Sequence, residues 1–458
     1  MISALGAAIS RLFAWLVPDP FVLAILLTVL TFLLAVTLTP TTPADLVGIW
    51  GGGRGLWSLL AFGMQMCLIL VTGYAVATSP PIERLTQRLA AMPRTGAQAI
   101  GMVALLAALA ALINWGLGLI VGAIGARQVG LAMERRGVPI HYPLVAAAGY
   151  LGMMVWHGGL SGSAPLKVTT ARDLIEVFGD PAPIGPIGLE QTLFSPLNLL
   201  VTGGLVAIAV GLMMALSPGS SAESLPPSHF GVTPELVQPV GAAEAKPRLI
   251  RWLEDTPLVT GVLVVLIALW AWRYYFPEVG RSGAWSLTPD TVNLTMLMVG
   301  LILQRTPANY LRAVEHGVRG CGGIILQFPL YAGIMGMMSV SGLTALFAAK
   351  LAATSDPTSL PVLTFLSAGV VNLFVPSGGG QWAVQGPIAV EAALRAGVDP
   401  ARMVMAVAYG DQVTNMLQPF WALPLLAITG VRARDIVGYT AIVMAVAVLW
   451  VAVSLWLA

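Results

Sequence analysis

One ionisable side chain lies inside a long apolar run near the end of the chain. Asp411 occurs in "YGDQVTNMLQP" and is followed by Asn415 and Gln418, at spacings of four and three residues. On a helix these spacings place the three side chains on one face. An acidic side chain within an apolar run that could span a membrane is energetically costly, and such residues usually have a function. It could carry a proton, or bind sodium together with Asn415 and unwound carbonyls; a partly wet carboxylate near a helix end is the structural alternative.

A second polar stretch, "HGGLSGSAP", runs from His157 to Pro165. Its glycines predict a helix break at which Ser161, Gly162 and Ser163 offer hydroxyl and N–H groups to an anion, or carbonyl oxygens to a cation. A kinked packing helix is the structural alternative. His157 is either a hydrogen-bonded structural residue or a proton relay.

Two asparagines precede further breaks in apolar runs. Asn114 and Gly116 belong to "INWGLG", and Asn372 opens "NLFVPSGGGQ". The side-chain oxygens of the asparagines could coordinate a cation such as Na⁺, which would make this the one candidate metal site. Asparagines that cap helices need no ligand, so both interpretations stay open.

The glycine run after Asn372 is the strongest candidate for anion binding. Its residues are Ser377, Gly378, Gly379, Gly380 and Gln381. A helix that starts after the glycines would point unpaired N–H groups and its dipole at an anion. The four polar segments contain no Lys or Arg, so the backbone is expected to supply much of the positive potential. Tight helix packing is the alternative role for the glycines.

Composition places these segments in a membrane protein. The chain has 458 residues, of which 57% are hydrophobic and 10% charged, whereas soluble domains carry roughly 25% charged residues. We see no basic tract for nucleic acid, no phosphate loop, no metal-ligand cluster and no nucleophile triad. The sequence therefore predicts no enzyme and no cofactor beyond a coupling ion.

Eleven apolar runs approach the length of a membrane-spanning helix. They are residues 20–39, 57–78, 97–126, 143–166, 196–216, 257–276, 289–306, 319–346, 358–394, 402–427 and 435–457. A Pro- and Ser-rich stretch at 217–256 is predicted to be a cytoplasmic linker.

The two sides of this linker resemble each other. From Asn114 to Tyr150 there are 36 residues, and from Asn372 to Tyr409 there are 37. Internal repeats of this kind are typical of secondary transporters. We therefore predict a first repeat at 1–216, a connecting transmembrane helix and loop at 257–288, and a second repeat at 289–458.

Two segments have a polar middle between apolar arms, and we expect re-entrant hairpins at 97–130 and 358–395. Nine transmembrane helices then remain (4 + 1 + 4), and the repeats enter the membrane from opposite sides. The fold class is thus an all-α polytopic membrane protein with two inverted repeats, about nine transmembrane helices, two re-entrant hairpins and broken helices at the substrate site. The Lys and Arg count is 15 on the N-terminal side against 8 on the other, which puts the N-terminus in the cytoplasm.

Several motifs together resemble a known family. "LLAFGMQMCLILVTGYAVA", "INWGLGLIVGA", "SGSAPL", "ILQFPLYAGI", "VPSGGGQWAVQGP" and "MLQPFWALPLLAI" look like the short-chain fatty acid transporter family, which includes bacterial acetoacetate and butyrate permeases. The resemblance spans nearly the whole chain and is weakest in the linker.

The resemblance implies a secondary active transporter of small monocarboxylates in the bacterial cytoplasmic (inner) membrane. It implies H⁺- or Na⁺-coupled symport by an elevator-type mechanism, in a bilayer and often as a homodimer. In that frame the glycine run, the "SGS" break and the asparagines hold the substrate, and Asp411, Asn415, Gln418 and His157 serve ion coupling. The alternatives are a passive anion channel or a transporter of another small carboxylate, because fold alone does not settle function.

Overall fold

The protein is built from helices. The computed structural model describes residues 20–218, 224–232, 247–277, 283, 287–353, 355–372 and 377–458, and within these ranges it has no β-strand, only an isolated bridge between His141 and Leu225. The all-helical prediction is confirmed. Residues 1–19 and much of the predicted linker lie outside the described residues.

The first half contains ten helices and two short 3-10 turns. They are α2 (Pro20–Leu38), α3 (Pro43–Gly51), α4 (Leu60–Ala77), α5 (Pro80–Ala90), α6 (Gly96–Ile113), α7 (Trp115–Arg135), α8 (Tyr142–Tyr150), η1 (Leu151–Met154), η2 (Trp156–Gly158), α9 (Ser163–Leu166), α10 (Ala171–Phe178) and α11 (Pro196–Ala215).

Three described helical elements connect the first half to the second. The connectors are η4 (Pro227–Phe230) and α12 (Arg248–Asp255), both inside the predicted linker, and α13 (Pro257–Tyr275). The second half comprises α14 (Pro289–Gln304), α15 (Pro307–Val318), α16 (Gly322–Val340), α17 (Leu343–Ala353), α18 (Ser359–Asn372), α19 (Gly378–Ala396), α20 (Pro400–Thr414), η6 (Asn415–Leu417), α21 (Pro419–Thr429) and α22 (Ala433–Leu457).

Many of these helices begin at a Ser-Pro or Thr-Pro pair. At the starts of α3, α11, α13, α14 and α15 the hydroxyl accepts a hydrogen bond from a backbone N–H of the first turn, and the proline follows it. The hydroxyl satisfies an N–H that the helix cannot, and proline lacks the N–H that would be orphaned. The sequence thus marks where the polypeptide turns back into the bundle.

Among the described residues, seven helices have the length and composition to cross a membrane: α4, α6, α7, α11, α13, α16 and α22. Two of the segments predicted to cross, 143–166 and 402–427, are instead interrupted helices. Each arm of the first predicted hairpin is a long helix, because α6 has 18 residues and α7 has 21. The Ala-rich sequence of α6 favours continuous helix, and α7 runs on past the apolar stretch to Arg135.

The elements of the two halves occur in the same order and make matching contacts. The series α2 to α8, break, α9 and α11 is repeated as α14 to α20, break, α21 and α22. In the first half α4 contacts α7, α5 contacts α7 and α6 contacts α11; in the second half α16 contacts α19, α17 contacts α19 and α18 contacts α22. The first elements are exchanged, since α2 packs on α16 and α14 packs on α4.

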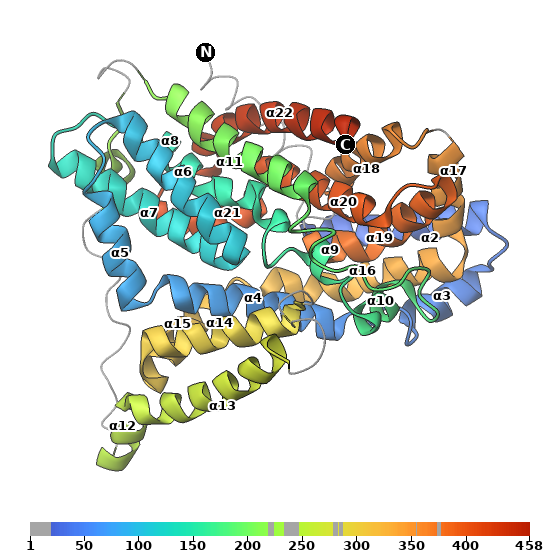
Figure 1. Ribbon diagram of the computed structural model, residues 1–458, viewed down its shortest axis with the longest axis horizontal. Helices are drawn as coiled ribbons and strands as arrows, with labels where there is room; N and C mark the ends of the chain where they lie inside the picture. Colours follow the sequence, from blue (N-terminus) through green and yellow to red (C-terminus); the bar gives the residue numbers. More distant parts are fainter. Residues whose placement is uncertain are drawn as a thin grey trace.

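The long helices lie roughly along one direction, which gives the molecule two ends (Figure 1). α5, α12 and α15 lie at one end, and α3, α10 and α17 lie at the other. α13 lies at the edge of the bundle, and only 11% of its most apolar 18-residue stretch is buried within the protein.

Close backbone packing ties the first hairpin to the interrupted helix beside it. A Cβ on Gly122 of α7 would lie 2.0 Å from the carbonyl oxygen of Gly149 in α8, and a Cβ on Gly149 would lie 2.5 Å from that of Gly122. Small residues at such a crossing let two helix backbones touch. The pair therefore fixes the position of the break that follows α8.

Gly122→Ala is expected to lower the free energy of unfolding by about 1–3 kcal/mol, because the added methyl group overlaps a backbone oxygen that cannot rotate away. Thermal unfolding of the purified protein in detergent measures this. Gly211→Ala on α11 is the matched control, since nothing lies within 4 Å of a Cβ there. Equal melting temperatures for the two variants would contradict the packing role of Gly122.

Candidate functional site

Two helices are interrupted, and the interruptions face each other. After α8 ends at Tyr150, the chain forms η1 and η2 before α9 begins at Ser163. After α20 ends at Thr414, η6 follows, and α21 begins at Pro419. The predicted break in "HGGLSGSAP" falls within the first interruption.

Each interruption supplies hydrogen bonds to the other. The Tyr150 hydroxyl lies 3.0 Å from the carbonyl oxygens of both Asn415 and Gln418. The Asn415 amide donates to the carbonyl oxygen of Met153 at 3.3 Å. Backbone groups that the broken helices leave unpaired are thereby satisfied inside the protein, as the bilayer requires.

The tip of the first hairpin is a helix cap. The Asn114 side-chain oxygen accepts from the N–H of Leu117 at 2.9 Å, and its amide donates to the carbonyl oxygen of Ile69. Ser161 accepts from the N–H of Trp115 at 2.9 Å, so the tip is joined to the first interruption. The Asn114 oxygen is thus engaged in capping, which favours the cap interpretation over a cation ligand.

The tip of the second hairpin is built differently. The Asn372 amide donates to the carbonyl oxygen of Asp411 at 2.7 Å, and lies 2.9 Å from the Thr414 hydroxyl and 3.0 Å from the Asn415 side-chain oxygen. The Gln418 amide donates to the Asn372 carbonyl oxygen. Ser377, rather than an asparagine, caps α19 here, by accepting from the N–H of Gly380 at 3.2 Å.

This tip leaves carbonyl-type oxygens free. The side-chain oxygens of Asn372, Gln381 and Gln418 are buried and have no hydrogen-bond partner among the described residues. Buried polar atoms usually have one. These oxygens are therefore the best cation ligands in the site, and they all come from the second half.

The shared helical face expected for Asp411, Asn415 and Gln418 is wrong. The helix ends at Thr414, so Asn415 and Gln418 do not continue the face of Asp411. Asp411 turns to His157, whereas Asn415 contacts both the first interruption and Asn372 at the second hairpin tip, and Gln418 contacts that tip as well.

His157 and Asp411 form a buried pair across the two halves. Their side chains are 0% and 1% exposed, and His157 Nδ1 lies 3.1 Å from Asp411 Oδ1. The N–H of Ala164 donates to His157 Nε2 at 3.0 Å, so Nε2 carries no proton. The proton of a neutral ring is then on Nδ1 and is donated to the Asp411 carboxylate.

This arrangement leaves one carboxylate oxygen available. Asp411 Oδ2 is buried without a hydrogen-bond partner among the described residues. A proton or a monovalent cation at Oδ2 would neutralise the pair without displacing the Ala164 N–H. The binding of a proton or a cation predicted for Asp411 would therefore occur at Oδ2.

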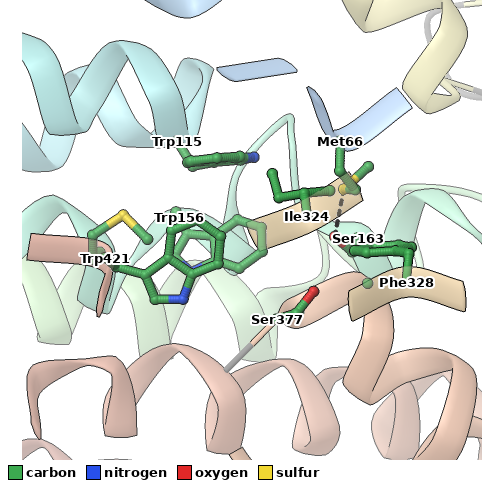
Figure 2. A pocket seen from close by; sticks show the side chains of 11 residues that line it. Met66, Trp115, Trp156, Ser163, Ile324, Phe328, Ser377 and Trp421 are labelled. Carbon is green, nitrogen blue, oxygen red and sulfur yellow. Dashed lines mark hydrogen bonds between the residues drawn. The ribbon is translucent and has the colours of Figure 1, made fainter. Parts of the chain in front are cut away.

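A small cavity of about 20 Å³ lies where both halves meet (Figure 2). It is lined by Met66, Trp115, Met153, Trp156, Ser163, Ile324, Phe328, Ser377, Gly378, Gly379 and Trp421. Such a volume holds about one water molecule. Its polar groups are the hydroxyls of Ser163 and Ser377 and the backbone of the glycine run; the remainder is aromatic and aliphatic.

Helix α19, which carries the glycine run, begins within that run. α19 starts at Gly378, so the glycines form its first turn rather than preceding it. The first N–H groups of a helix have no acceptor within the helix. The N–H of Gly380 is taken by Ser377, which leaves those of Gly378 and Gly379 at the cavity wall.

The glycines are required for close packing, not for unusual backbone angles. None of the three has a positive φ, so side chains at these positions are excluded by neighbouring rings and not by the backbone angles. A Cβ would lie 2.5 Å from the Trp156 ring at Gly378, 2.9 Å from the Phe62 ring at Gly379 and 2.4 Å from the Tyr331 ring at Gly380. Packing and anion access therefore coexist in one segment.

Other predicted residues have supporting positions. Gly116 and Gly162 admit backbone contacts, because a Cβ would lie 2.9 Å from Leu70 Cα and 2.2 Å from the His157 carbonyl oxygen respectively. Of the predicted substrate-binding residues, four line the cavity: Ser163, Ser377, Gly378 and Gly379.

The aromatic walls were not predicted. Trp115 packs edge-on against Trp156 and Trp421, with ring centroids 6.2 Å and 5.2 Å away. Trp156 stacks on His157 at 4.3 Å, so the cavity wall touches the buried pair. Trp115 lies in the predicted break "INWGLG", and Trp156 and Trp421 lie just outside the polar segments at 157–165 and 409–419, so attention to polar side chains overlooked all three.

Gly379→Ala is expected to push the rings of Phe62 and Phe328 and to close the cavity further, which should weaken binding of a small carboxylate by about tenfold. Direct binding to the purified protein tests this, with thermal unfolding measured alongside. Gly322→Ala on α16 is the control, because nothing lies within 4 Å of a Cβ there. Unchanged carboxylate affinity in Gly379→Ala would remove the glycine run from the binding site.

Comparison with known proteins agrees with this architecture. A protein of Escherichia coli K12 that carries the provisional name of short-chain fatty acid transporter is 40% identical over 446 residues, covering 96% of each chain. A protein of Haemophilus influenzae with the same provisional name is 38% identical over 441 residues, again covering 96% of each chain. The crystal structure of the Alcanivorax borkumensis YdaH transporter has a similar fold, with a TM-score of 0.60 at 17% identity, covering 96% of this chain and 98% of that one.

The family model described as "Short chain fatty acid transporter" matches residues 1–458. This is the family that the sequence motifs resemble, and the match leaves no part of the chain outside it. The protein therefore belongs to the short-chain fatty acid transporter family.

Proposed function

We propose that the protein is a secondary active transporter that carries short-chain monocarboxylates, such as acetoacetate or butyrate, across the bacterial inner membrane in symport with H⁺ or Na⁺. The observation that supports this best is the position of the cavity. It lies between both hairpin tips, the first interruption and the start of α21, and its wall touches His157 of the His157–Asp411 pair. Substrate and coupling ion would therefore bind in contact with one another.

The cavity chemistry fits a short amphipathic anion. The N–H groups of Gly378 and Gly379, with the Ser163 and Ser377 hydroxyls, can donate to a carboxylate. The tryptophan and methionine walls fit a short alkyl chain. At about 20 Å³ the cavity is too small even for acetate, so binding requires the walls to separate.

A narrow, mostly apolar cavity favours a carrier over a passive pore. A channel needs a continuous polar path, whereas Trp115, Trp156 and Trp421 form much of the wall of this site. In an elevator-type cycle, the hairpins and interrupted helices would move together against α4 and α16, which supply Met66 and Phe328 to the same cavity.

Either coupling ion has a place in the site. A proton would bind at Asp411 Oδ2, while Na⁺ would use that atom with the free side-chain oxygens of Asn372 and Gln418. Oxygen ligands of this kind suit hard cations. In both cases the ion neutralises a buried charge before the loaded site crosses the membrane.

Uptake of labelled butyrate into proteoliposomes, with pH and Na⁺ gradients imposed separately, tests the proposal. The wild-type protein should accumulate butyrate against its gradient with one of the two ions. Asp411→Asn should abolish this uphill uptake while leaving butyrate exchange partly active, because the variant keeps the shape but not the charge.

Asp255→Asn, at an exposed position in α12, should behave as wild type. Butyrate equilibration that ignores both gradients would indicate a passive pore instead. Undiminished uphill uptake in Asp411→Asn would exclude Asp411 as the coupling carboxylate.

We also propose that the halves are inverted repeats with two re-entrant hairpins, and that the N-terminus is cytoplasmic. The repeated order of elements supports this, as does the clustering of the basic helices α5, α12 and α15 at one end of the molecule (Figure 1). Arg84, Arg88, Arg248 and Arg312 lie on these helices. An excess of such residues marks the cytoplasmic face.

Single cysteines at Met92 and Leu457 are expected to be labelled from opposite sides of the membrane. Both side chains are exposed, 66% and 78% respectively, and the proposed topology puts Met92 in the cytoplasm and Leu457 outside. A membrane-impermeant thiol reagent applied to intact cells and to inverted vesicles distinguishes them. Labelling of both from the same side would exclude an odd number of crossings between them, and with it the proposed inversion.

A further inference from the structure

A lysine lies next to the cavity, just beyond the polar segment that contains Ser163. Lys167 is 0% exposed and is the only Lys or Arg among the described residues whose side chain is buried. Its N–H donates to the Ser163 carbonyl oxygen at 3.0 Å, so it is one turn beyond a residue that lines the cavity. One helical turn is about 5.4 Å, which places a buried cation close to the carboxylate site.

Two carboxylates of α10 hold this ammonium group. Lys167 Nζ lies 2.9 Å from Asp173 Oδ1 and 2.7 Å from Glu176 Oε2. Asp173 is itself fixed by the Thr170 hydroxyl, 2.6 Å from its other oxygen. One acid would suffice to pair one buried base. The second acid makes the cluster formally negative, beside a site that is proposed to accept an anion.

The Phe62 ring contacts both Lys167 and the wall of the cavity. Nζ lies 4.5 Å from the centroid of Phe62, a cation–π distance. The same ring packs edge-on against Phe328 at 5.6 Å and lies against Gly379, and both of these residues line the cavity. The ammonium therefore has the α10 carboxylates as partners and is connected through Phe62 to two residues of the cavity wall.

We propose that Lys167 is a positioning residue that attracts the substrate carboxylate across Phe62, and that Asp173 and Glu176 of α10 weaken this attraction by competing for the same cation. The proposal rests on the proposed function, because it takes a carboxylate as the ligand of the cavity. Among buried side chains the effective dielectric constant is about 20 rather than 80, so a charge acts more strongly over such separations than it does in water. The α10 carboxylates thus lower the affinity of the site for the anion, so that the anion can be released.

α10 is placed to make this competition depend on conformation. Phe178 at its end packs edge-on against Trp382 of α19, with ring centroids 6.0 Å apart. α19 also carries the glycine run, so a shift of the second hairpin relative to α10 would alter the Lys167 pairing and the N–H groups of Gly378 and Gly379 together.

The test is the sign of the change in butyrate affinity, measured by direct binding to the purified full-length protein. Glu176→Gln removes a competing charge from a side chain that is 19% exposed, and should tighten butyrate binding about threefold. Lys167→Met should weaken it at least tenfold, and Lys167→Arg should restore most of the loss. Glu391→Gln, which breaks the exposed pair with Arg395 on α19, is the matched control and should change nothing.

A purely structural ion cluster predicts the opposite pattern for Glu176→Gln, with lower thermal stability and butyrate binding that is unchanged or weaker. That result overturns the inference, whether or not Lys167→Met folds. If the wild-type protein binds no short-chain carboxylate, the proposed function itself fails, so the two failures are distinct.

Discussion

The constraint on which this structure depends is that a bilayer offers no hydrogen-bond partner to a broken helix. A transporter of a charged substrate nevertheless needs free backbone groups, because side-chain cations inside the membrane are costly. The protein meets both demands by bringing its two interruptions together. Tyr150 and Asn415 satisfy the backbone across the halves, while the N–H groups of Gly378 and Gly379 stay at the cavity wall.

The same contacts tie the substrate position to the buried charge. Trp156 forms part of the cavity wall and stacks on His157, which donates to Asp411. A Cβ on Gly378 would lie 3.0 Å from His157 Cε1, so the second hairpin tip also packs on this ring. The Ala164 N–H of α9 is bonded to the other ring nitrogen, and Gly378 of α19 packs on the ring. A change of charge at Asp411 would therefore act on both α9 and α19. The proposed coupling between ion and substrate would then need no long-range path, only a ring shared by the two proposed sites.

Much of the site could be predicted from the sequence, but only where the signal is local. The helix break at 157–165, the polar glycine run and the unusual Asp411 all stand out against apolar neighbours. Their partners do not, since His157 and Asp411 are 254 residues apart. The common face expected around Asp411 failed because the helix stops at Thr414, which periodicity alone does not reveal. The steric reason for the glycine run depends on Phe62 and Tyr331, which reach it only in the folded protein.

Lys167 is another residue whose position could not be predicted from the local sequence. A lysine that follows an apolar segment is expected to lie in the loop outside the membrane, and its burial depends on two acids six and nine residues later in α10. The prediction that the backbone supplies the positive potential concerns the N–H groups alone, whereas the proposed role of Lys167 adds an ammonium group from a different element. A backbone site alone holds an anion with constant strength. Under the proposed mechanism, a cation shared with α10 would allow the strength to change with movement of the hairpin, and an alternating-access cycle requires that change, because the substrate must be bound on one side and released on the other.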